Sequence, residues 1–132
     1  MPNSKKMNFS FVLILFSVAL SSCSNKTDCS DLRTGTFTTQ TETNGIVTVI
    51  RTETQSIEKL PEINQEATNS LVWTGDCTFT ISYESGDKGP HWTSDLPIDC
   101  KIIEIGEDFH IVRSTIRGTK YTYDYKMENK KN

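Results

Sequence analysis

The sequence lacks the short motifs from which an enzymatic activity is usually inferred. It contains no P-loop, no dinucleotide-binding glycine fingerprint and no Gly-x-Ser-x-Gly nucleophile elbow. Its four cysteines include no Cys-x-x-Cys pair, which a thiol oxidoreductase needs near the start of a helix. We therefore expect a protein that is not an enzyme and has no catalytic residues.

Metal-binding patterns are also missing. The two histidines, His91 and His110, have no paired spacing of the kind that places two imidazoles on one metal ion. Asp87, His91 and Asp95 fall within one expected loop, but their spacing matches no known ligand pattern. The sequence predicts no metal site.

Positive charge is scarce and scattered. From residue 23 onward, 12 basic residues stand against 17 acidic ones, which gives a net charge near −5. Nucleic-acid binding needs a concentrated basic face, and the one close basic pair in this part is Lys130–Lys131. The balance excludes nucleic acid as a partner and predicts an acidic, solvated surface.

The single long apolar run is too short to span a membrane. It covers residues 9–20, about a dozen positions, whereas a spanning helix needs about 20. Lys5 and Lys6 precede it, and a basic segment followed by a short apolar core is typical of an export signal. We expect residues 1–22 to be a cleaved signal peptide.

The apolar run ends in Leu20-Ser21-Ser22-Cys23, which resembles the bacterial lipobox. In that motif the cysteine thiol accepts diacylglycerol, the freed amino group is acylated as well, and two or more chains anchor stably. Ser24 follows in place of an aspartate, and by resemblance to the sorting rule of enteric bacteria this favours the outer membrane. We expect lipidation at Cys23, no other cofactor, and a lipidated N-terminus and tether over residues 23–31; the leaflet stays open.

From Leu32 onward the pattern has period two and predicts an all-β fold. Thr-rich and β-branched runs alternate with Gly, Asn, Asp and Pro clusters, and Asn44-Gly45 is a strong hairpin signal. We expect one antiparallel meander over residues 32–128, followed by a polar tail over residues 129–132. About seven or eight strands would form a β-sandwich or a small, lipocalin-like up-and-down barrel. The predicted strands are Gly35–Gln40, Ile46–Arg51, Thr54–Leu60, Ser70–Thr74, Cys77–Tyr83, Ile98–Ile105, Phe109–Ser114 and Gly118–Met127, with a loop or one helical turn over residues 61–69.

Alternation along these strands also predicts which side chains face inward. One face of the fifth strand carries Cys77, Phe79, Ile81 and Tyr83, and the last strand carries a stripe of three tyrosines and Met127. Core packing is the simpler interpretation, because aromatic residues fit a half-buried pleated surface. The alternative is the wall of a cavity, since an eight-stranded barrel can hold one small ligand. The candidate cavity residues are Phe79, Ile81, Tyr121 and Tyr123.

Three cysteines remain once Cys23 is set aside, and an exported protein keeps disulfides. Cys77 and Cys100 flank one loop, and a strand register in which paired residue numbers sum to 177 would place them opposite each other. Cys29 with Cys77 is the alternative and would fasten the tether to the sheet. Either bridge is expected to contribute about 3–4 kcal/mol.

Three segments together resemble a group of small lipoproteins of Bacteroidota, of the flavobacterial type, some of which carry the misleading name DNA topoisomerase. They are Asp28-Cys-Ser-Asp-Leu-Arg-Thr-Gly-Thr-Phe37, Arg51-Thr-Glu-Thr-Gln-Ser-Ile-Glu58 and Val72-Trp-Thr-Gly-Asp-Cys-Thr-Phe-Thr-Ile-Ser-Tyr83. The resemblance implies a pairing of Cys29 with Cys77, and Cys100 departs from the pattern. It implies no activity and no site residues beyond the cysteines and the lipid.

The expected function is that of a membrane-anchored envelope lipoprotein that acts as a binding or structural module. Its partner would be an envelope protein, a glycan or a small apolar ligand. The alternative is a lipocalin-like carrier that holds a small apolar molecule inside the barrel.

Overall fold

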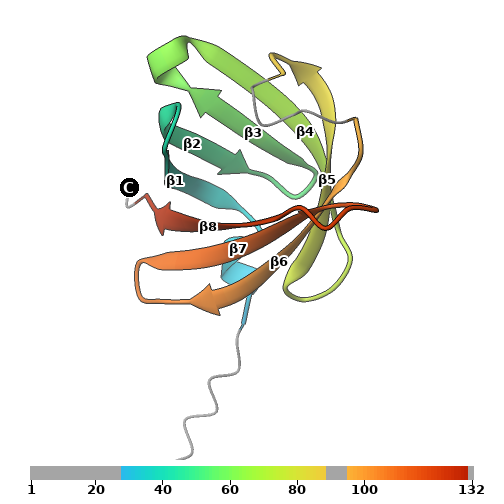
Figure 1. The fold of residues 1–132 in the computed structure, drawn as a ribbon. Coiled ribbons are helices and arrows are strands. Elements are labelled where there is room, and N and C mark those ends of the chain that lie inside the picture. The colour runs from blue at the N-terminus through green and yellow to red at the C-terminus, as the bar shows by residue number, and fades with distance from the viewer. Residues whose placement is uncertain (1–27, 89–94, 131–132) are drawn as a thin grey trace, which may run out of the picture.

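The computed structural model describes residues 28–88 and 95–130 (Figure 1). The expected signal peptide and the lipidation residue Cys23 lie outside the described residues, as does His91 of the long loop. Eight antiparallel strands follow one another around a closed barrel (Figure 1). They are β1 (Gly35–Thr41), β2 (Gly45–Arg51), β3 (Gln55–Leu60), β4 (Gln65–Trp73), β5 (Thr78–Gly86), β6 (Ile98–Ile105), β7 (Phe109–Ile116) and β8 (Thr122–Asn129).

Closure distinguishes between the two expected architectures. The last strand, β8, pairs with β1 through Phe37–Asn129 and Thr38–Glu128, so the sheet returns on itself and is a barrel rather than a sandwich. The all-β meander is confirmed. Among the described residues, the strand pairs that close the barrel lie within residues 35–129.

The hairpin at Asn44-Gly45 forms as the sequence predicts. Gly45 has a φ of +68°, a left-handed backbone conformation that most residues other than glycine and asparagine adopt only at a cost in free energy. This turn sets the register of β1 against β2, in which Thr39 faces Val47 and Phe37 faces Val49. All four side chains are buried, because period two places them together on the inner face.

Strand β4 is longer than its sequence predicts. It begins at Gln65, directly after the short 3₁₀ helix η2 (Pro61–Ile63), whereas the hydrophobic pattern indicated a start at Ser70. The inward positions of the extra segment are Ala67 and Asn69, which carry no strong apolar signal. A bulge between Thr68 and Asn69 shifts its register against β5.

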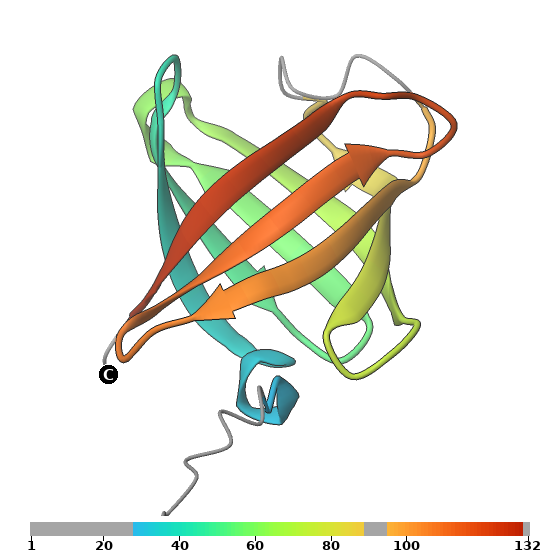
Figure 2. The same cartoon turned by 60° about the horizontal axis from the view of Figure 1, so that its bottom comes forward.

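The N-terminal end of the described chain closes one end of the barrel. A 3₁₀ helix, η1 (Ser30–Leu32), lies across the barrel bottom (Figure 2), and a disulfide joins Cys29 to Cys77 with 5.4 Å between their Cα atoms. Cys29 is 1% exposed and Leu32 also belongs to the core. Cys29 and η1, at the end of the segment expected to be a tether, therefore pack against the barrel.

Of the two pairings that the sequence left open, the bridge between Cys29 and Cys77 forms and the cross-strand bridge between Cys77 and Cys100 does not. Cys100 pairs with Phe79, not with Cys77, so the register of β5 against β6 differs by two residues from the one that bridge requires. Cys77 lies just before β5, and its carbonyl accepts a hydrogen bond from the Ile102 N–H. Cys100 is a free, buried thiol.

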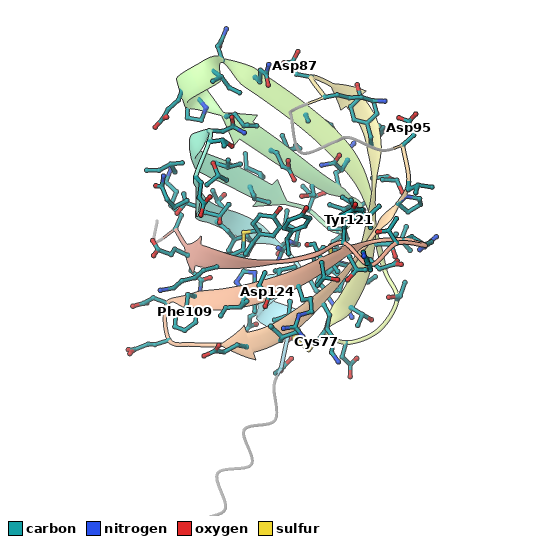
Figure 3. The ribbon with its side chains drawn as sticks, viewed as in Figure 1. Cys77, Asp87, Asp95, Phe109, Tyr121 and Asp124 are labelled. Carbon is teal, nitrogen blue, oxygen red and sulfur yellow. A yellow bond between two sulfur atoms is a disulfide. The ribbon has the colours of Figure 1, made fainter. Side chains whose placement is uncertain are left out.

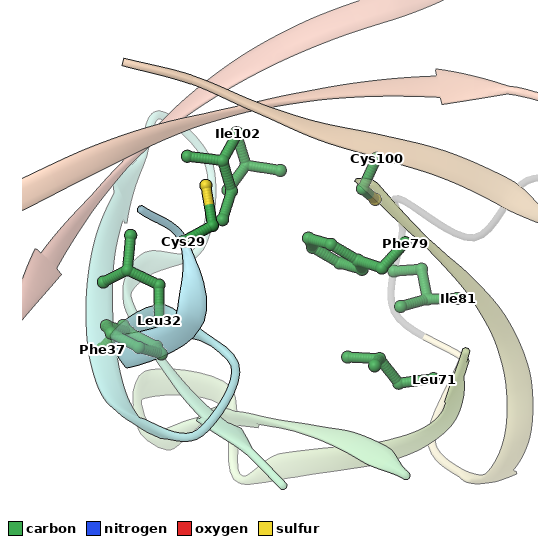
Figure 4. Packing of buried hydrophobic residues seen from close by; sticks show 9 residues of the cluster. Cys29, Leu32, Phe37, Leu71, Phe79, Ile81, Cys100 and Ile102 are labelled. Carbon is green, nitrogen blue, oxygen red and sulfur yellow. The ribbon is translucent and has the colours of Figure 1, made fainter. Parts of the chain in front are cut away.

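Buried side chains of η1, of Cys29 just before it and of five strands meet in the main hydrophobic core. Figure 4 shows Cys29, Leu32 and Phe37 on one side of the barrel interior and Phe79, Ile81 and Leu71 on the other. A smaller cluster of Val47, Val49 and Leu60 lies on β2 and β3. Cys29 and Leu32 belong to the main cluster, so η1 packs against the barrel interior at the end that it closes.

Removing the disulfide should lower the free energy of unfolding by about 4 kcal/mol, because the bridge closes a loop of 48 residues in the unfolded chain. The comparison is denaturant unfolding of the Cys29→Ser/Cys77→Ser variant against the parent chain. The control is Cys100→Ala, which keeps the bridge and should lose stability when a reductant is added. Equal sensitivity of the double variant to reductant would contradict the assignment.

Candidate ligand-binding cavity

The barrel interior contains a cavity of about 630 Å³. Its wall consists of apolar side chains from β2, β5, β6, β7 and β8. Polar residues line it near the β1–β2 turn and again around Arg51 and Ser56. The lining residues are Thr39, Gln40, Thr41, Glu42, Thr43, Val47, Val49, Arg51, Ser56, Glu58, Phe79, Ile81, Ile98, Cys100, Val112, Ser114, Ile116, Tyr123, Asp124, Tyr125 and Met127. The cavity therefore runs from the end of the barrel with the β1–β2 turn, here called the open end, down to Arg51 at the end of β2.

The junction of β1 and β8, here called the seam, borders this cavity. The two strands pair at two positions near the closed end, and no pairing joins Thr39–Thr41 to residues 122–127. A second cavity of about 300 Å³ is lined by residues of β1, β2 and β8 along the same seam. Figure 2 shows β1 and β8 diverging toward the open end. The seam and the open end are thus the routes by which a small molecule would reach the interior.

Three of the four candidate cavity residues line the cavity, and Tyr121 does not. Phe79, Ile81 and Tyr123 are on its wall. Tyr121 lies in the turn before β8 and is 56% exposed (Figure 3), because the strand starts at Thr122 rather than at Gly118. The period-two pattern predicted an inward-facing tyrosine at position 121, but the tyrosines that line the cavity begin at Tyr123.

Arg51 is a buried cation at the floor of the cavity. It is 3% exposed, and its guanidinium Cζ lies 4.7 Å from the Phe37 ring centre and 5.0 Å from that of Phe79. Its Nη1 donates a hydrogen bond of 2.7 Å to the Leu32 carbonyl, at the end of η1. None of the ion pairs found among the described residues includes Arg51. Its positive charge is compensated by one carbonyl and two aromatic faces.

Burial lowers the pKa of Arg51 to about 10, and Cys100 acts in the opposite direction. The guanidinium is still protonated at neutral pH. No sequence pattern singles out Arg51, since an arginine at the end of a strand is ordinarily solvated.

His110 is fully buried beside this guanidinium. Its Nε2 lies 3.4 Å from Arg51 Nη1, and its ring packs edge-on against Phe37 with centroids 4.8 Å apart. Burial and, as a smaller cause, the Arg51 charge lower the pKa of His110 to about 4, while Asn129 acts in the opposite direction. At neutral pH the imidazole is uncharged. Because arginine can only donate, Nε2 accepts and the ring proton is on Nδ1.

Three polar side chains form one row across strands β2, β3 and β4, beginning with Arg51 at the floor of the cavity. Arg51 pairs with Ser56 in the register of β2 and β3, and Ser56 pairs with Asn69 in that of β3 and β4. All three are buried, with Asn69 completely so. Neither the Oδ1 nor the Nδ2 of Asn69 has a hydrogen-bond partner among the described residues, nor does the Nε of Arg51. Buried polar groups are usually paired, so these atoms are an exception that packing alone does not account for.

Cys100 lines the same cavity but is not an activated nucleophile. Burial raises the pKa of its thiol to about 11, although the Ser114 hydroxyl, 3.5 Å from its sulfur, acts to lower it. At neutral pH the group is a thiol rather than the reactive thiolate. Cys100 therefore contributes a small, weakly polar surface to the wall.

The open end carries the acidic groups of the cavity. Glu42 and Asp124 line it there, and Asp124 is paired with Arg113, with 2.9 Å between Oδ1 and Nε. Glu58 lies deeper on β3, two residue pairs nearer the open end than Ser56, and is half-buried. Its charge raises the pKa of Tyr125, for which burial is the larger cause.

Within the described residues, no group of three or more His, Cys, Asp and Glu side chains is arranged to hold a metal ion. In the same part of the chain, no helix has the length and apolar character that crossing a bilayer requires. The fold is a closed, lipocalin-like barrel with an internal cavity. No family model, no curated protein and no solved structure matches the chain.

His110 makes the stability of the barrel depend on pH. Its pKa is 6.5 when unfolded and about 4 when folded, so the unfolded chain binds a proton first as pH falls. The contribution of the neutral imidazole is complete above pH 6.5 and is lost between about 6.5 and 4, to a limit of about 3 kcal/mol.

The measurement is the free energy of unfolding as a function of pH for the parent chain and for His110→Gln, whose amide oxygen can replace Nε2 as acceptor. The difference between the two should change over this window and be constant above it. Parallel curves from pH 7 to 4 would contradict a buried neutral His110.

Proposed function

We propose that this protein is a lipid-anchored carrier of the bacterial envelope that holds one small, largely apolar molecule inside its barrel. The observation that carries the proposal is the cavity of about 630 Å³, lined by Val47, Val49, Phe79, Ile81 and other apolar side chains. Ligand cavities in proteins typically measure about 300–1,000 Å³ and are mostly apolar with a few polar groups. A purely structural module would be expected to fill this space with side chains.

The divergence of β1 and β8 also supports a carrier. A barrel that closes over its whole length offers a ligand no lateral path, and here the two strands are paired at Phe37 and Thr38 but not beyond. Polar residues such as Thr39, Gln40 and Asp124 line the unpaired part of the seam. Their hydrogen-bonding groups can remain solvated while the apolar interior is reached between them.

Support for the anchor comes from the sequence. The lipobox-like segment ends at Cys23, and the described chain starts a few residues later at Asp28, beside the closed end of the barrel. Anchored there, the domain would turn its closed end to the lipid and its open end away from it. The resemblance to small Bacteroidota lipoproteins points to the same envelope location.

Ser114→Phe should weaken binding of the neutral fluorescent probe N-phenylnaphthylamine by tenfold or more, because the added ring enters the cavity beside Cys100. The matched control is Lys101→Phe, which adds a ring at an exposed position on the neighbouring strand β6. Binding is followed by fluorescence titration, with thermal unfolding of both variants recorded. A folded Ser114→Phe variant that binds like the parent would contradict an internal site.

Cys23→Ala should abolish incorporation of labelled palmitate and move the protein out of the membrane fraction, because the thiol that accepts the lipid is gone. The control is Cys100→Ala, which removes a different thiol and should leave both properties unchanged. Membrane association that survives Cys23→Ala would argue against the lipid anchor.

A further inference from the structure

We propose that Arg51, Ser56 and Asn69 form an anion subsite at the floor of the cavity, which selects carboxylate amphiphiles over neutral ones of equal chain length. This inference rests on the proposed function, since it assigns the chemical class of the molecule that the cavity holds. It adds a polar recognition element to a cavity otherwise described by its apolar walls.

The three side chains belong to one row of the barrel. Arg51 is opposite Ser56, and Ser56 is opposite Asn69, on neighbouring strands. Side chains directly opposite each other have Cβ atoms about 4.5–5.5 Å apart, so one small polar group can contact neighbouring members of the row. Arg51 and Ser56 line the cavity, and Asn69 is beside Ser56.

The row is rich in hydrogen-bond donors that the protein leaves unused. Asn69 is 0% exposed, and neither of its polar atoms has a partner among the described residues. The guanidinium of Arg51 has five N–H donors and no acceptor. Its Nε also has no hydrogen-bond partner among the described residues. A buried cation without a carboxylate partner favours an anion, and guanidinium matches a carboxylate through two parallel hydrogen bonds.

The wall above the row is apolar. Val49 on β2, Phe79 on β5 and Val112 on β7 face the cavity between Arg51 and the open end. From Arg51 to Gly45, six residues of β2 span about 20 Å at about 3.4 Å per residue. A molecule with its charged head at Arg51 would therefore place an apolar chain along this wall, which is the arrangement of an amphiphile.

Glu58 opposes an anion in this cavity, and its position limits the effect. It is two residue pairs farther from the floor than Ser56, which is the next inward-facing position on β3, so a head group in contact with Arg51 would lie a full inward-facing row away from the Glu58 carboxylate. Coulomb energy falls with distance, and the contact with Arg51 therefore outweighs the more distant repulsion. Glu58 also supplies a control, because its charge can be removed without changing the shape of the side chain.

The test uses the chain from Ser24 onward, whose barrel closes within residues 35–129. N-phenylnaphthylamine is displaced by dodecanoate and, in a parallel titration, by 1-dodecanol, which has the same chain length and no charge. We expect dodecanoate to displace the probe at a concentration roughly 10- to 100-fold lower, the range that a hydrogen bond to a charged group gives. Equal or reversed potency would overturn the anion subsite.

Variants then assign the preference to the row. Arg51→Met retains an unbranched apolar chain between the two rings and should abolish the preference for dodecanoate. Asn69→Leu has the same branching without the amide, so the ligand-free protein should be equally or more stable while the preference falls. A merely structural Asn69 would instead give a less stable protein with an unchanged preference. Glu58→Gln should maintain or increase the preference.

If Arg51→Met does not fold, Asn69→Leu decides the question alone, since it removes no hydrogen bond found among the described residues. A parent chain that binds neither the probe nor either dodecyl compound would refute the carrier function together with the subsite. A parent chain that binds the probe and both compounds equally would refute the subsite and leave the carrier function standing.

Discussion

The hydrogen bond from the Arg51 guanidinium to the Leu32 carbonyl connects the barrel wall to the helix that closes it. Burying that charge is unfavourable, and the structure offsets it with the carbonyl of η1, the rings of Phe37 and Phe79, and a neutral His110. The same contacts hold η1 across the barrel, where the disulfide from Cys29 fastens it a second time. Rigidity is therefore concentrated at the closed end, and the polar floor of the cavity is a consequence of how that end is built.

Much of the barrel follows from local sequence signals. Alternation in β2 and β5 places Val47, Val49, Phe79 and Ile81 inside, and the Asn44-Gly45 turn determines how β1 meets β2. These features depend on residues close together in the chain, which is why period two and turn chemistry predict them. The choice between barrel and sandwich depends on whether β8 reaches β1, and no local pattern contains that information.

The features that the sequence did not predict involve buried polar residues or exact register. Asn69 interrupts the apolar alternation of β4, so the hydrophobic pattern did not predict the first half of that strand. An arginine at the end of a strand is expected to be solvated, yet Arg51 is 3% exposed. Phe37, Phe79 and η1 contact its guanidinium and exclude water. The expected bridge to Cys100 failed by two residues of register, and a slip of that size keeps every side chain on its own face, so hydrophobic pattern cannot detect it.

The two ends of the barrel differ in how they contribute to the stability of the fold and to the access of a ligand to the interior. Near the closed end, β1 and β8 are paired and η1 fills the interior, while toward the open end the same strands diverge and the interior is hollow. Filling the cavity with larger side chains would add apolar contacts, but it would also remove the space above Arg51. Two buried polar side chains with unused hydrogen-bonding groups are a further loss of stability that packing alone does not explain. The missing apolar contacts and the missing hydrogen bonds lie in the same part of the interior. A molecule with an anionic head and an apolar chain would supply both.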